Sequence, residues 1–100
     1  MGVDLRWRDE SELEAIEDPK MLLSSHVQSR EWRDTSCLRF IDPWGDAVFN
    51  QLQIPVLIQE LESSLAEARD VNVREHVDRV IGVLRHAINK THTYAWFVGD

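Results

Sequence analysis

The strongest constraint on the fold is a pair of amphipathic helical patterns in the second half of the chain. Apolar residues recur at the three-to-four-residue spacing of one helix face, first at Ile54, Leu57, Ile58, Leu61, Leu65 and Ala68, and then at Val73, Val77, Val80, Ile81, Leu84 and Ile88. Residues 69–72 interrupt this spacing. The sequence therefore predicts two antiparallel helices joined by a short connection.

Segments with β-strand patterns flank these helices. Residues 3–8 alternate between apolar and charged side chains, which is typical of a half-buried strand, and residues 13–16 are interpreted as the returning strand of a hairpin. A second hairpin is predicted from residues 37–41 and 47–49, and a last strand from the β-favouring residues 91–98.

The segment between the two predicted hairpins starts with a helix signal. Asp18 can cap free backbone N–H groups and Pro19 fits the first helical turn, so a short helix is expected through residues 21–23. Residues 24–35 lack periodicity and are interpreted as a long loop. The expected fold is a single α+β domain over residues 1–100 with the order β-β-short α-β-β-α-α-β. Its small, mainly antiparallel sheet would carry two antiparallel helices on one face.

The charge of the chain favours some partners over others. Acidic residues outnumber Lys and Arg by 18 to 11, and residues 9–18 contain six acids and no base. Such a segment repels nucleic acid and anionic membranes, and it attracts a basic protein, with Glu10, Glu12 and Glu14 as candidate contacts. The alternative is a solvated hairpin tip that only maintains solubility. Without a signal-peptide pattern or a long apolar run, the expected location is the cytoplasm.

Cysteine and histidine give no sign of a metal or a cofactor. Cys37 is the only cysteine and is expected to be a small buried hydrophobe, with a reactive nucleophile as the alternative. The four histidines do not share a helix face, so no metal site is predicted. His76 and His86 are expected at the surface or at its boundary.

One group of polar residues could form a catalytic or ligand-binding pocket. Asp42 and Asp46 flank a Pro-Trp-Gly turn, and His92 is a third candidate member. Paired carboxylates can act as acid and base when their environments differ. The structural alternative is that both aspartates only stabilise the turn, since Asp side chains bond to nearby backbone N–H groups. No catalytic residue is assigned.

Aromatic residues provide the other candidate site. Trp32 and Trp44 lie in predicted loops and are either exposed anchors for a partner or lids over the core. In the last strand, Tyr94 and Trp96 fall on one face and Phe97 on the other. One face must meet the helices, so the other joins the outer side of the sheet, together with arginines of the first and third strands.

These features support three hypotheses. The first, which we favour, is a non-enzymatic protein-binding module for a basic partner, such as an acidic inhibitor or immunity-type protein, which would use the acidic segment and the tryptophans. The second is a small enzyme or ligand-binding domain around Asp42 and Asp46. The third is a homo-oligomer joined through the outer sheet face or the last strand.

Overall fold

The computed structural model describes residues 2–8, 13–18, 20–28, 35–42, 44–89 and 94–99, without the side chains of residues 6–8, 13–15 and 28. Its strands are β1 (Val3–Arg8), β2 (Leu13–Ile16), β3 (Asp46–Phe49) and β4 (Tyr94–Gly99). Its α-helices are α1 (Leu22–Gln28), α2 (Ile54–Ser64) and α3 (Val71–Ala87), and short 3-10 helices cover Leu38–Phe40 (η1) and Leu65–Glu67 (η2).

The four strands form one sheet in the order β2-β1-β4-β3. All three neighbouring pairs are antiparallel, which confirms the predicted sheet type. The C-terminal strand β4 lies between β1 and β3 and has no free edge. Among the described strands the outer edges of the sheet therefore belong to β2 and β3, and the homo-oligomer hypothesis stays a prediction.

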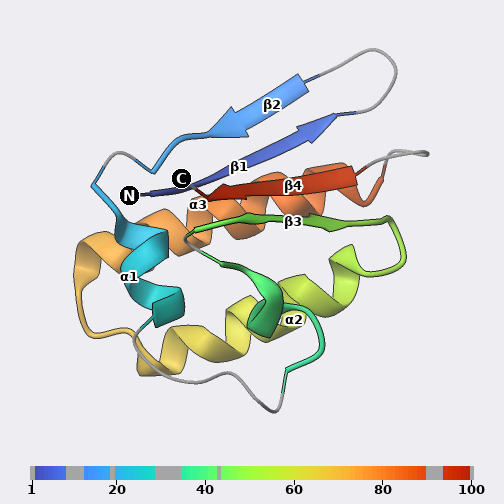
Figure 1. The fold of residues 1–100 in the computed structure, drawn as a ribbon. Helices are drawn as coiled ribbons and strands as arrows, with labels where there is room; N and C mark the ends of the chain where they lie inside the picture. The colour runs from blue at the N-terminus through green and yellow to red at the C-terminus, as the bar shows by residue number, and fades with distance from the viewer. Residues whose placement is uncertain are drawn as a thin grey trace.

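The helices cover one face of this sheet, as Figure 1 shows. Helices α2 and α3 run antiparallel and pack against each other, and α3 also contacts β1, β2 and β4. Leu61 of α2 and Leu84 of α3 are completely buried, as the helical patterns predict. On the sheet side of the core, the rings of Phe49 and Phe97 meet edge to face with centroids 5.7 Å apart. The α+β fold with two packed helices is thus confirmed.

Residues 37–41 do not form the predicted strand. Leu38–Phe40 is a turn of 3-10 helix, so β3 pairs with β4 alone among the described strands. The cause is Glu60 on α2, whose Oε1 accepts hydrogen bonds of 2.9 Å from the backbone N–H groups of both Cys37 and Leu38. One carboxylate oxygen that accepts from two consecutive N–H groups stabilises a helical turn. In an extended strand, consecutive N–H groups point in opposite directions and could not share this acceptor.

Cys37 is buried, as expected from its apolar neighbours. Burial raises the pKa of its thiol, and the nearby Glu60 carboxylate raises it further. The thiol is therefore held in its protonated, weakly nucleophilic form at neutral pH. The structural interpretation of this cysteine is supported, since both effects on its pKa that the described residues exert oppose activation.

The predicted short helix is longer than the sequence pattern indicates. Helix α1 extends to Gln28 and so occupies the first part of the predicted 24–35 loop. The buried Asp18 carboxylate caps it, because Oδ1 accepts from the N–H of Leu22 and Oδ2 from that of Ser24. Residues 29–34, including Trp32, lie outside the described part of the chain. Among the described helices, none has the length and apolar character needed to cross a membrane.

Candidate functional site: the outer face of the sheet

The outer face of the sheet carries exposed aromatic residues. Along β4 the side chains alternate, with Ala95 and Phe97 buried toward the helices and Tyr94 and Trp96 exposed on the other side at 50% and 47%. Val48 of β3 lies directly opposite Trp96 in the antiparallel register and is also exposed. We call Val48, Tyr94 and Trp96 the outer aromatic face.

The strand register places charged residues around this face. Asp4 of β1 and Asp46 of β3 both lie opposite Val98, so two acidic positions flank β4 near its C-terminal end. Two residues back along β4, Trp96 lies between Val48 and the backbone position of Arg6. The register thus places acidic positions at one end of this face, Trp96 at its centre, and the arginine positions of β1 opposite Trp96 and Tyr94.

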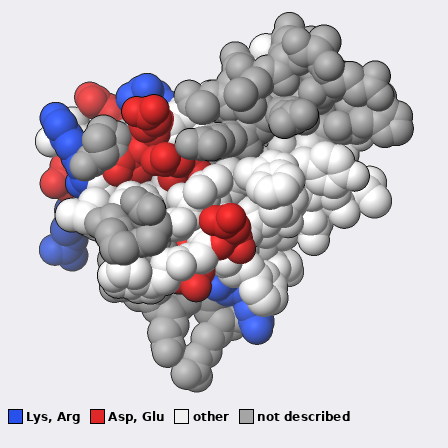
Figure 2. All heavy atoms as spheres, turned by 45° about the horizontal axis from the view of Figure 1, so that its top comes forward, with Lys and Arg blue, Asp and Glu red and all other residues white. Residues whose placement is uncertain are grey.

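Figure 2 shows the molecule with the outer side of the sheet tilted toward the viewer. Carboxylate residues gather on one part of this view with Lys and Arg residues beside them, and a mostly uncharged area that contains further carboxylates lies next to them. Exposure of this apolar surface to water is unfavourable, because burial of apolar area contributes about 25 cal/mol per Å² of favourable free energy. Val48, Tyr94 and Trp96 therefore form an exposed apolar group on the outer face of the sheet.

The turn before β3 exposes a further aromatic residue. Trp44 is 69% exposed, so it is an exposed side chain and not a lid over the core. The turn is fixed by Asp42, whose Oδ1 accepts the Trp44 N–H at 2.9 Å, and by a 2.8 Å bond from the Gly99 N–H to the Gly45 carbonyl. A Cβ at Gly99 would lie only 2.3 Å from that carbonyl oxygen, so this close approach requires glycine.

The pocket suggested for Asp42 and Asp46 has no structural support beyond the turn itself. Both side chains are exposed, and Asp42 serves the turn as described above. No group of three His, Cys, Asp or Glu residues that could hold a metal occurs among the described residues. His92, the third candidate, lies outside the described ranges. The structural role of Asp42 is the one that the hydrogen bonds support.

Other predicted contact residues cannot be placed relative to the outer aromatic face. Glu10 and Glu12 lie outside the described residues, as does Trp32. Glu14 belongs to β2, opposite Trp7, but its side chain is not among those described. The acidic-segment hypothesis thus stays a prediction.

The sequence interpretation missed a buried polar cluster below α1. His76 of α3 is only 5% exposed, although the sequence predicts it at the surface or at its boundary, whereas His86 is exposed as predicted. The Nε2 atom of His76 has no hydrogen-bond partner among the described residues and lies 3.6 Å from Asp18 Oδ1, which is too long for a hydrogen bond. A second buried histidine, His26, bonds through Nε2 to Ser64 Oγ at 2.8 Å. Histidines placed in this way are sensitive to pH.

Burial lowers the pKa of both His26 and His76. At His76 the Asp18 carboxylate partly offsets this effect, and Arg79 adds to it. Since the pKa of each histidine is lower in the folded state, the unfolded chain binds protons first as the pH falls. We expect the free energy of unfolding to decrease below the unfolded-state pKa of about 6.5.

This pH dependence can be measured by urea unfolding at pH values from about 7.5 to 5.5, above the range in which most carboxylates titrate. The double variant His26→Gln and His76→Gln should show a flatter dependence than the wild type. The exposed His86 provides the control, since His86→Gln should keep the wild-type slope. An unchanged slope in the double variant would contradict the assignment.

Three comparisons with known proteins complete this description. The chain matches no protein-family model, and searches of curated proteins and of solved structures found no match.

Proposed function

We propose that the protein is a non-enzymatic protein-binding module that contacts a basic partner through the outer aromatic face. The observation that carries this proposal is the half-exposed pair Tyr94 and Trp96 on one regular sheet surface, with Val48 beside Trp96. Aromatic residues are enriched at the centres of protein interfaces, where they bury large areas with few rotatable bonds.

The net charge of the chain favours a basic partner. Asp4 and Asp46 flank the acidic end of the outer aromatic face, and the chain as a whole carries a net charge of −7. A basic protein would be attracted over a distance of about one Debye length, roughly 8 Å at physiological ionic strength. Rim charges of this kind mainly accelerate association, while the buried aromatic residues determine how long the complex lasts.

The rigidity of the surface supports binding without a large rearrangement. β4 pairs along its whole length with β1 and at Ala95–Val98 with β3, so its backbone is held on both sides at Trp96 and on the β1 side at Tyr94. Phe97 and Ala95 anchor the same strand in the core. A preorganised face loses little conformational entropy when it is covered.

The proposal can be tested with a partner isolated on the tagged chain and identified by mass spectrometry. Trp96→Thr and Tyr94→Thr each introduce a β-branched residue that favours the strand, so the fold should persist. If these rings are interface hot spots, each change should weaken the measured Kd about 30-fold, equivalent to about 2 kcal/mol.

The matched control is Val71→Thr, which removes an exposed apolar side chain from α3, away from the sheet surface. It should change the Kd less than about twofold. Urea midpoints must be measured for all three variants. Wild-type affinity in both β4 variants would place the contact elsewhere and contradict the proposal.

A further inference from the structure

Helix α1 is attached to the rest of the fold through a small set of contacts. It packs mainly on α3 and belongs neither to the sheet nor to the α2–α3 pair (Figure 1). Two of its side chains, Leu23 and Val27, belong to the hydrophobic core. Elements with few core contacts can open at a lower free energy than the whole fold. We propose that α1 is a pH-gated element, which detaches from α3 in mildly acidic solution while the sheet and the α2–α3 pair stay folded.

The start of α1 is strained and depends on Asp18. Met21, the residue before the helix, has a φ of 57°, the only positive value among the described non-glycine residues. This left-handed conformation is unfavourable for a residue with a Cβ. The Asp18 carbonyl accepts the Met21 N–H at 3.1 Å, and the Asp18 carboxylate accepts the N–H groups of residues 22–24. Detachment of α1 relieves the strain that these bonds maintain.

His76 of α3 lies beside the capping carboxylate. Its Nε2 is 3.6 Å from Asp18 Oδ1, an oxygen that already accepts from Leu22 at 2.6 Å and from Leu23 at 3.2 Å. A protonated ring would form a charge-assisted bond of about 2.8 Å only if Nε2 and Oδ1 moved closer together. Protonated His76 and the first N–H groups of α1 therefore compete for one acceptor.

A second buried histidine lies on α1 itself. The Nε2 of His26 bonds to Ser64 Oγ of α2 at 2.8 Å, and the Ser64 hydroxyl donates to the Leu61 carbonyl at 2.6 Å. A hydroxyl has only one hydrogen, so Ser64 accepts from Nε2–H and the neutral ring satisfies this contact. A further proton adds a positive charge to a buried ring, which is unfavourable. Detachment of α1 removes this cost for both histidines.

The pKa shifts have the direction that the gate requires. Burial lowers the pKa of both His26 and His76, and at His76 this effect exceeds the opposing effect of Asp18. In the detached form both rings are in water, where the pKa is about 6.5. The detached form therefore binds protons more readily than the closed form, and acid shifts the equilibrium toward it.

The charged residues around the two rings do not cancel this effect. Arg79 on α3 lowers the pKa of His76 further, and the sequence of α1 contains no Asp, Glu, Lys or Arg. The other charged groups on neighbouring elements are Asp4, which accepts from the Asp18 N–H, Glu60, which caps η1, Glu62, which pairs with Arg85, and the exposed Glu17, Lys20, Glu67, Glu75 and Asp78.

Native-state hydrogen exchange measured by NMR tests the proposal on the wild-type protein. The N–H groups of Ser24 and Ser25 report detachment of α1, and those of Val80 and Ile81 in the middle of α3 report global unfolding. At about pH 7.5 the α1 amides should have protection factors at least tenfold lower than the α3 amides. Between about pH 7.5 and 5.5 the α1 values should fall at least tenfold, as expected when one histidine is protonated only in the open form.

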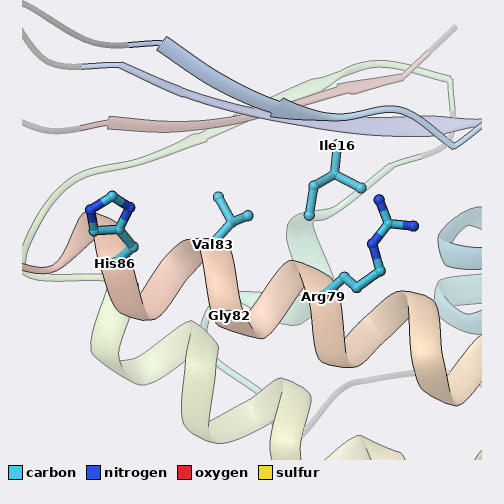
Figure 3. A pocket seen from close by; sticks show the side chains of 5 residues that line it. All are labelled: Ile16, Arg79, Gly82, Val83 and His86. Atoms are coloured by element: carbon cyan, nitrogen blue, oxygen red, sulfur yellow. The ribbon is translucent and has the colours of Figure 1, made fainter.

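Variants identify the groups that take up the protons. In the double variant His26→Gln and His76→Gln, the α1 protection factors should change less than twofold over the same pH range. His86→Gln is the matched control and should keep the wild-type pH dependence. His86 is exposed and lies about two helical turns beyond Arg79, in a shallow groove between α3 and β2 (Figure 3). The groove is also lined by Ile16, Gly82 and Val83.

Three results would overturn the proposal. Equal protection of the α1 and α3 amides would mean that α1 opens only with the whole fold. Protection of α1 that does not change with pH would remove the gate, and a full pH dependence in the double variant would assign the protons to other groups. Trp96→Thr should leave the pH dependence of the α1 amides unchanged, so this proposal and the proposed function can fail independently.

Discussion

Asp18→Ala should lower the free energy of unfolding by about 3–5 kcal/mol, because it leaves several buried donors without a partner. The Asp18 carboxylate is buried and accepts backbone hydrogen bonds of 2.6–3.2 Å from Val3, Leu22, Leu23 and Ser24. It therefore links β1 to the start of α1. Asp18 also receives support from β1, since its own N–H donates to Asp4 Oδ1 at 2.8 Å.

The control for this change is another aspartate cap. Asp70 at the start of α3 accepts from Asn72 and Val73, but it is exposed, so water can replace it. Asp70→Ala should cost only about 1 kcal/mol, a typical value for an N-cap. Urea unfolding of both variants gives the comparison. Equal losses of stability would show that Asp18 is an ordinary helix cap and does not connect the two elements.

Leu61→Ala and Leu84→Ala should each lower the free energy of unfolding by about 2–5 kcal/mol, since each removes a fully buried side chain from packed surroundings. Leu61 belongs to α2 and Leu84 to α3, and these helices pack against each other. The exposed Leu52 is the matched control, and Leu52→Ala should stay within about 0.5 kcal/mol of the wild type. Unchanged urea midpoints for both core variants would mean that the helical stripes do not form the core.

The elements with a regular pattern were predictable from the sequence. The spacing of apolar residues predicts α2 and α3, and strict alternation predicts β1. In β4 the same alternation separates the buried Phe97 from the exposed Trp96, which is how the outer aromatic face could be anticipated. The period of the apolar residues indicates which side of an element is buried. In these segments the buried side faces one common core, so the pattern is sufficient.

Elements controlled by one distant side chain were not predictable. Residues 37–41 have β-favouring composition, but Glu60 caps their N–H groups from a helix 22 or more positions later in the chain. In the same way, His76 is buried because Asp18 and α1 lie over it. The groove beside Gly82 was also missed, since a single glycine on a helix carries no signal until the neighbouring strand is known.

The most direct test of the binding proposal is a photo-crosslinking measurement of where the partner contacts the protein. A photo-crosslinking amino acid introduced at Val48 would lie next to Trp96 on the outer aromatic face. The same group at Gln59, an exposed position on α2, serves as the control. In cells of the source organism, we expect a crosslinked basic protein from position 48 alone, with loss of the product when Trp96→Thr is added. Equal products from positions 48 and 59, or a product that persists in Trp96→Thr, would contradict the account.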